Sequence, residues 1–194
     1  MTAHPTFVRV FAQRFIKEEL RKYAESGAGI PLVIDSYEDI FSDFDPRPYS
    51  NKALSGDFLL ECKKASTDKE GRIKMRFFLP KNKRNLLEEI KIKKRLKEHF
   101  NKHLRGKRRE ISGMKMEGAF WAFMGAVMMV VSAFFFGKQD LSFGIHLLTT
   151  LVQPAGWFFL WEGLAKILIN PKEKLPDYYF YKKMSCSEIS FANL

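Results

Sequence analysis

A stretch of twenty residues without a charged side chain, residues 118–137, lies between Glu117 and Lys138. An α-helix rises about 1.5 Å per residue, so a helix of this length spans the roughly 30 Å hydrocarbon core of a bilayer. A second apolar stretch follows at residues 141–161, and its apolar character continues to Ile169. Soluble helices of this length normally keep one polar face, and the first stretch has none. The sequence therefore predicts two transmembrane helices joined by a tight turn, with a buried helical hairpin of a soluble protein as the alternative.

Positive charge flanks this predicted hairpin on one side. Residues 81–115 contain 14 Lys and Arg against 4 Asp and Glu, a net of +10 out of +11 for the whole chain. Five more lysines follow between residues 166 and 183, whereas the turn contains only Lys138 and Asp140. Since positive residues stay on the cytoplasmic side, we expect a bacterial inner (plasma) membrane protein with both termini in the cytoplasm. Three tryptophans are predicted to anchor the spans at the cytoplasmic interface: Trp121, Trp157 and Trp161.

Small residues recur at intervals of four in the first predicted span. Membrane helices associate where small residues let their backbones approach closely. The spacing predicts a packing surface, either between the two spans or between copies of the chain, and we expect a homo-oligomer. The predicted packing residues are Gly118, Ala122, Gly125, Ala126, Ala133 and Gly137.

The rest of the chain predicts a small α+β domain. Residues 6–25 have the pattern of an amphipathic helix, and residues 30–35 and 72–79 have the pattern of strands. Two strands are too few for a stable sheet, so the alternating residues 187–191 are predicted to return as a third. The predicted fold is a membrane α-helical hairpin with a small α+β cytoplasmic domain. Its parts are residues 1–112 with a basic linker helix, 113–169 as the hairpin, and 170–194 as a cytoplasmic tail.

A long basic helix is predicted to begin near Asn85 and to continue into the first span. A narrow apolar seam is predicted along it, formed by Leu86, Ile90, Leu96, Phe100 and Leu104. Its positive charge has three interpretations: anionic lipid headgroups, an acidic protein partner or a nucleic acid. Lipid is favoured by the position beside the span, where each Lys or Arg contributes about 1 kcal/mol. The predicted membrane-surface or partner-binding residues are Lys91, Lys94, Lys97, Arg105, Lys107, Arg108 and Arg109.

The titratable residues predict no catalytic centre. The acidic cluster between Asp35 and Asp45 lacks a second acidic motif or a glycine loop, so caps and turn hydrogen bonds are its expected roles. His99 and His103 lie four residues apart without a third zinc ligand. We therefore expect a non-enzymatic protein without a cofactor or a metal.

Two short motifs resemble a family of uncharacterised bacterial two-span membrane proteins. The first is a D-P-x-P-[FY] turn after a strand, here Asp45, Pro46, Pro48 and Tyr49, and the second is G-W-x-x-x-W in the second span, from Gly156 to Trp161. The resemblance implies the two-span architecture with a structural turn in the cytoplasmic domain, and it implies no activity.

Two functional hypotheses follow. Small two-span proteins with a basic cytoplasmic domain recur in bacterial antiphage defence, and this analogy suggests a regulated membrane effector. The alternative is a constitutive scaffold that anchors a partner at the membrane. The expected partners are anionic lipid headgroups, further copies of the chain, and a cytoplasmic protein or nucleoprotein.

Overall fold

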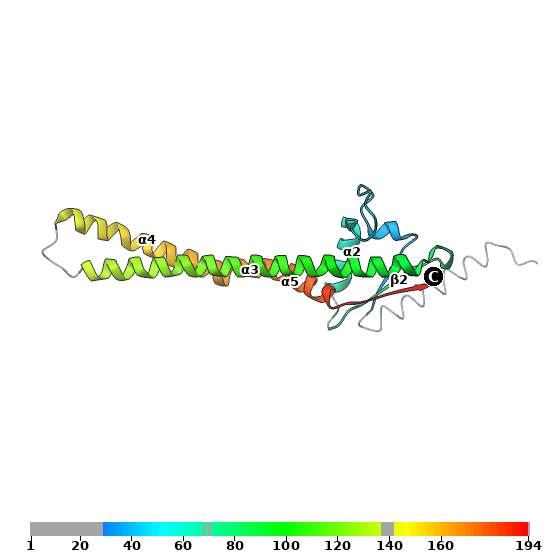
Figure 1. Cartoon of the computed structure of the whole chain (residues 1–194). Helices are drawn as coiled ribbons and strands as arrows, with labels where there is room; N and C mark the ends of the chain where they lie inside the picture. Colours follow the sequence, from blue (N-terminus) through cyan, green and yellow to red (C-terminus); the bar gives the residue numbers. More distant parts are fainter. Residues whose placement is uncertain (1–28, 68, 70, 137–141, 194) are drawn as a thin grey trace, which may run out of the picture. The chain divides into compact units, whose positions relative to one another are not determined.

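The structure is a computed structural model, and it describes residues 29–67, 69, 71–136 and 142–193 (Figure 1). Within the chain two compact units form, the sheet unit (residues 1–104 and 179–194) and the hairpin unit (residues 105–178). The elements in chain order are β1 (Gly29–Val33), η1 (Tyr37–Ile40), α2 (Gly56–Thr67), β2 (Lys74–Leu79), η2 (Lys81–Lys83), α3 (Leu86–Phe136), α4 (Phe143–Leu168), α5 (Asn170–Ser185) and β3 (Glu188–Asn193).

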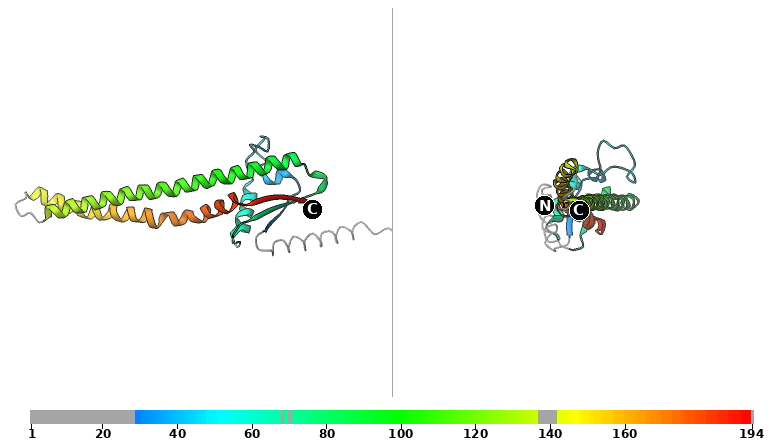
Figure 2. Two further views of the ribbon diagram at one scale, coloured as in Figure 1. Left: turned by 60° about the horizontal axis from the view of Figure 1, so that its bottom comes forward. Right: turned by 90° about the vertical axis from the view of Figure 1, so that its left-hand side faces the viewer.

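The sheet has three parallel strands in the order β1-β2-β3. Ile30 pairs in register with Met75, and Met75 pairs with Ile189. Parallel neighbours need long crossover connections, and here α2 joins β1 to β2 while α3, α4 and α5 join β2 to β3 (Figure 2). The predicted small three-stranded sheet is thus confirmed, including the strand near the end of the chain. The predicted helix at residues 6–25 lies outside the described residues.

One core holds the sheet unit together. Strand β2 alternates, with Met75, Phe77 and Leu79 buried on one face. That core also includes residues from α2, α3, α5 and β3, namely Phe58, Cys62, Ile92, Leu96, Phe100, Phe180, Met184 and Ile189.

The buried face of α3 differs from the predicted seam. Leu86 and Ile90 are 72% and 63% exposed, so the prediction was wrong at both positions. The buried line is Ile92, Leu96 and Phe100 at spacings of four, and it begins at Glu89. Hydrogen bonds from Arg84 and Tyr37 hold Glu89 inward, so the buried face of α3 is rotated relative to the predicted seam.

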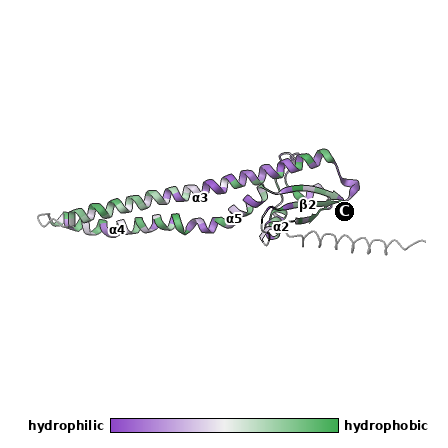
Figure 3. Cartoon of the chain, turned by 90° about the horizontal axis from the view of Figure 1, so that it is seen from below, coloured by the Kyte–Doolittle hydropathy of each residue, from purple (hydrophilic) through white to green (hydrophobic). Residues whose placement is uncertain are grey.

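The hairpin unit contains two helices that are long and apolar enough to cross a membrane. Their most apolar windows have mean hydropathies of 1.9 and 1.3. Only 17% and 11% of these windows are buried inside the protein, whereas the core helix of a soluble protein is mostly buried. Figure 3 shows hydrophobic residues along α4 and the part of α3 beside it.

The tail contains a helix that the sequence argument did not anticipate. Residues 170–194 were expected as a tail with a strand, but Asn170–Ser185 form α5 before β3 begins. A signal was present, because Pro171 suits the first turn of a helix and Lys182 and Lys183 suit its last turn.

Candidate functional site

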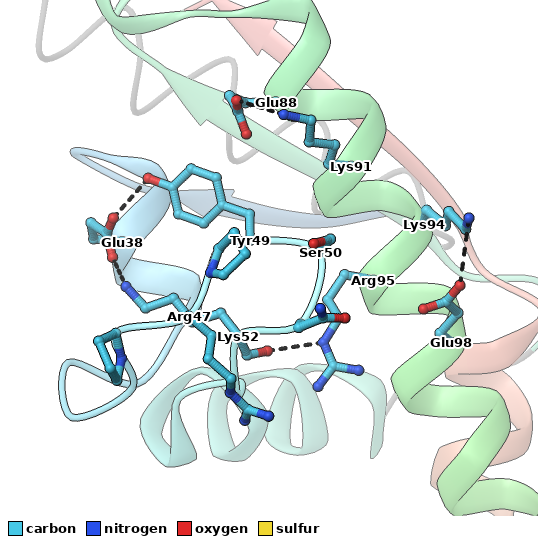
Figure 4. Close-up of a pocket in the computed structure, with 13 residues that line it drawn as sticks. Glu38, Arg47, Tyr49, Ser50, Lys52, Glu88, Lys91, Lys94, Arg95 and Glu98 are labelled. Atoms are coloured by element: carbon cyan, nitrogen blue, oxygen red, sulfur yellow. Dashed lines mark hydrogen bonds and ion pairs between the residues drawn. The ribbon is translucent and has the colours of Figure 1, made fainter.

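A groove of about 640 Å³ lies in the sheet unit between the loop at residues 46–52 and the first turns of α3 (Figure 4). We call it the turn groove. It brings together two sets of residues that were predicted separately. Pro46, Pro48 and Tyr49 come from the predicted structural turn, and Lys91 and Lys94 come from the predicted basic helix.

Asp45 holds the turn in shape. Its carboxylate accepts hydrogen bonds from the backbone N–H groups of Arg47 (3.1 Å) and Ala53 (2.7 Å). The Arg47 guanidinium also donates from Nε (2.9 Å) and Nη2 (2.7 Å), and with these bonds it holds the pKa of Asp45 well below its usual range. The two prolines restrict the backbone further. The wall of the groove is therefore fixed before any ligand binds.

A hydrogen-bond network at the surface joins the turn to η1. The Tyr49 hydroxyl donates to Glu38 Oε1 (2.7 Å), and Lys52 Nζ donates to Glu38 Oε2. The hydrogen bonds from Lys52 and Tyr49 lower the pKa of Glu38. Burial, together with the neighbouring Glu38 carboxylate, raises the pKa of Tyr49 to about 12. At neutral pH Glu38 is therefore a carboxylate and Tyr49 a neutral phenol, and the Lys52–Glu38 ion pair connects the turn to η1.

The α3 wall of the groove supplies accessible positive charge. Arg95 Nε donates to the Lys52 carbonyl (2.9 Å), and within the described part of the chain no carboxylate forms an ion pair with Arg95. Lys91 contacts Glu88 (3.1 Å) and Lys94 contacts Glu98 (4.0 Å), each within one helical turn. Exposed pairs of this kind contribute little stability, so an incoming anion can replace them. The groove suits an anionic ligand or an acidic partner.

A second network fixes the start of α3. Glu89 is 3% exposed, and its carboxylate accepts from Arg84 (2.7 and 3.0 Å) and from the Tyr37 hydroxyl (3.2 Å). Tyr37 in turn accepts from the Asn85 backbone N–H (2.9 Å). The sequence argument missed these residues because the charges of Arg84 and Glu89 were counted as part of a solvated basic helix. Together they hold the α3 wall in place beside the turn.

The rings of His99 and His103 lie one turn apart on α3, with centroids 4.3 Å apart and an interplanar angle of 37°. His99 Nε2 is buried, and no described residue forms a hydrogen bond with it. Burial, together with the charge of His103, lowers the pKa of His99 to about 4. In the described residues no three His, Cys, Asp or Glu side chains group in a way that could hold a metal ion.

Helices α3 and α4 pack closely through small residues that repeat every seven positions. A Cβ atom built on Gly125 would lie 2.4 Å from the Leu160 backbone N and 2.6 Å from the Gly156 O. One built on Gly118 would lie 2.7 Å from the Gly163 O. Farther along, the Ser132 hydroxyl donates to the Thr149 carbonyl (3.0 Å). Only residues with little or no side chain permit this approach.

This seam differs from the predicted packing surface. Gly118, Ala122 and Gly125 lie on it, but Ala126 and Ala133 are exposed. The prediction followed a spacing of four, whereas two helices that pack along their length keep a contact line with a seven-residue repeat. Gly137 lies outside the described residues. The α4 partners of the seam, Gly156 and Gly163, were missed although they also lie seven residues apart.

Aromatic and charged side chains gather near the α5 end of α4. Lys166 bridges to Glu117 of α3 (2.5 Å) and Trp121 donates to the same carboxylate (3.4 Å). The predicted anchors Trp157 and Trp161 are exposed on α4. The remaining predicted basic residues divide: Lys107 pairs with Glu110 (3.2 Å) and Asp177 (3.5 Å), while Lys97, Arg105, Arg108 and Arg109 are exposed.

Comparison with known proteins leaves the function to be argued from these features. No protein-family model, no curated protein and no solved structure matches the chain.

Proposed function

We propose that the chain is a non-enzymatic, regulated membrane effector of a bacterial inner membrane. In this proposal the hairpin unit spans the bilayer and the sheet unit lies in the cytoplasm with both termini. An anionic ligand or acidic partner binds in the turn groove and controls how the hairpins assemble or perturb the bilayer. Antiphage defence is the biological setting that the analogy with small two-span effectors suggests.

The apolar surface of the hairpin unit supports membrane insertion. Large side chains such as Phe120, Phe123 and Phe134 of α3 and Phe158 of α4 are exposed to the surroundings. Exposure of each side chain to water loses about 1.5–3 kcal/mol of the free energy that burial provides, whereas lipid solvates these side chains. The flanking Lys and Arg residues support the orientation, because the segment between α3 and α4 has a single positive residue, Lys138.

The observation that carries the regulatory part is the continuity of α3. The groove residues Lys91, Lys94 and Arg95 and the seam residues Gly118 and Gly125 belong to one helix of 51 residues. A ligand that binds the groove differently in two states of the protein shifts the population between them. Because α3 has no break between the groove and the apolar stretch, a tilt or rotation of its first turns changes the span directly.

A constitutive scaffold is the second candidate. The turn groove favours it equally, since a basic groove in a chain that also has a membrane anchor suits an acidic protein or nucleoprotein partner. The two candidates differ in whether the hairpin itself changes the bilayer.

Controlled expression in cells with a membrane-potential dye separates them. We expect the wild-type chain to depolarise the membrane once its amount exceeds that of any restraining partner. We compare it with a groove variant, Lys91→Gln with Lys94→Gln, and a matched control on the same helix, Lys97→Gln with Lys102→Gln. The groove variant should change the amount of inserted protein needed for half-maximal depolarisation, and the control should not.

Cells that express the wild-type chain and cells that express the groove variant are compared at equal amounts of inserted protein. If both keep their full membrane potential, the effector function is contradicted and the scaffold is favoured. Equal changes in the groove variant and the control would show that general positive charge, rather than the groove, matters.

A further inference from the structure

A smaller notch lies in the hairpin unit between α3 and α5. It has a volume of about 270 Å³, and its lining combines two cations, two hydroxyls and an apolar floor. Arg108, Ile111, Ser112 and Lys115 come from α3, and Leu175 and Tyr178 come from α5. We call it the α3–α5 notch.

Ion pairs connect α5 to α3, and the carboxylates near the notch take part in them. Lys174 contacts Glu110 (3.3 Å), and Lys107 contacts both Glu110 (3.2 Å) and Asp177 (3.5 Å). The hydrogen bonds from Lys107 and Lys174 lower the pKa of Glu110, so this carboxylate stays ionised and paired.

Arg108 and Lys115 are left with their charge available. In the part of the chain that the structure describes, neither cation forms an ion pair with a carboxylate, and both side chains are exposed. A cation pair on one side of a notch, seven residues apart on one helix face, is suited to a single anionic group placed between them.

The position along α3 identifies the level of the notch relative to the apolar stretch. At about 1.5 Å per residue, Lys115 and Ser112 lie roughly 4.5 and 9 Å before Gly118, where that stretch begins. The headgroup region of a bilayer is roughly 5–8 Å thick on each side of the hydrocarbon core. Lys115 therefore lies within the headgroup region and Ser112 lies at its outer edge. Arg108 is about two turns farther out, and its long side chain extends toward the same level.

We propose that the α3–α5 notch binds the phosphodiester headgroup of an anionic membrane phospholipid, a role that rests on the proposed insertion of the hairpin. The Arg108 guanidinium and the Lys115 ammonium contact the phosphate oxygens, and the Ser112 hydroxyl donates a further hydrogen bond. Ile111 and Leu175 contact the methylene groups of the headgroup glycerol, which lies on the water side of the phosphate. The apolar floor distinguishes this site from one for a free phosphate, which has no apolar part to cover it.

Native mass spectrometry of the full chain tests the site. The protein is purified from membranes containing phosphatidylglycerol and phosphatidylcholine, and the lipid retained per chain is counted after a detergent wash. We expect retention of one phosphatidylglycerol by the wild-type chain and a loss of about tenfold in the variant Arg108→Gln with Lys115→Gln. The matched control, Arg105→Gln with Arg109→Gln, removes the same charge from the same helix outside the notch and should retain the lipid.

Undiminished retention in the notch variant would overturn the site, and equal losses in the control would overturn it in favour of general attraction to the surface. Displacement of the lipid by inorganic phosphate or glycerophosphoglycerol at matched concentration would instead identify a free-phosphate site. Alkaline carbonate extraction separates failure of the proposed function from failure of the notch proposal. A chain that carbonate releases from the membrane is not inserted. An inserted chain that retains no phosphatidylglycerol contradicts the notch alone.

Discussion

Three of the acidic residues between positions 35 and 45, namely Glu38, Asp39 and Asp45, form local hydrogen bonds through their carboxylates. The Asp39 carboxylate accepts from the backbone N–H groups of Asp35 (2.7 Å) and Ser36 (3.1 Å) and closes a capping box at the start of η1. Asp45 binds the turn, and Glu38 binds Tyr49 and Lys52. The carboxylates of Glu38, Asp39 and Asp45 are therefore engaged in a cap and in the turn.

The pH dependence of stability should report the environment of His99. Folding lowers the pKa of His99 to about 4 through burial and through the charges of His103, Arg95 and Lys102. The ordinary histidine pKa is about 6.5, so between these values the unfolded chain binds a proton that the folded chain does not. The contribution of His99 is therefore fully present above pH 6.5 and is lost as the pH falls toward 4.

A variant isolates this effect from the carboxylates that titrate in the same range. We expect His99→Gln to lose less unfolding free energy than the wild-type chain between pH 7 and pH 4.5, measured by thermal unfolding of the full chain in detergent. Tyr181 stacks on His103, which lies against His99, so the ring packing should be checked by near-ultraviolet circular dichroism. Parallel pH profiles for the two proteins would contradict a buried neutral His99.

At the scale of elements, α3 shows that two glycines of one helix have opposite roles. Gly125 lies against the backbone of α4, while a Cβ atom on Gly113 would meet nothing within 4 Å. Close approach of α3 and α4 requires a glycine at position 125, whereas Gly113 only weakens the helix.

Paired substitutions test this difference. We expect Gly125→Leu to lower the unfolding free energy of the hairpin by about 2–3 kcal/mol, because the backbones of Leu160 and Gly156 cannot move aside as a flexible side chain could. Gly113→Ala should raise it by roughly 0.5–1 kcal/mol. Loss of helicity during titration with sodium dodecyl sulfate in mixed micelles measures both. Similar stabilities for wild type and Gly125→Leu would place this face of α3 away from α4.

The elements differ in how far the sequence predicts them. The apolar part of α3 followed from an uninterrupted apolar stretch, α4 followed from a stretch interrupted by His146, Gln153 and Pro154, and the third strand followed from its alternating pattern. Helix α5 has a weak hydrophobic pattern of its own, and no local signal reveals its contacts with α3, such as the Lys174–Glu110 ion pair. The contact face of α3 was also beyond sequence reasoning, because small residues occur on several faces and the partner helix selects among them.

For the whole molecule, the turn groove illustrates the same limit. Its two walls are residues 46–52 and 88–98. Along the sequence, about a third of the residues of the sheet unit lie between them, including β2. The motif at Asp45 and the charge of α3 were both visible in the sequence, but their meeting depends on the tertiary contacts of Glu89 and Arg95. Sequence patterns therefore identified both walls without indicating that they form one groove.

The central claim is that α3 and α4 cross a membrane with the sheet unit and both termini on one side. Cysteine labelling in intact and permeabilised cells tests it with a reporter that the chain already contains, because Cys186 is exposed whereas Cys62 is buried. Two further reporters, Thr2→Cys and Gln139→Cys, are made in a Cys186→Ser background. With a membrane-impermeant maleimide we predict labelling of position 139 in intact cells, and labelling of positions 2 and 186 only after the inner membrane is permeabilised. Labelling of position 2 or 186 from outside, or protection of position 139 in intact cells, would contradict the two-span topology.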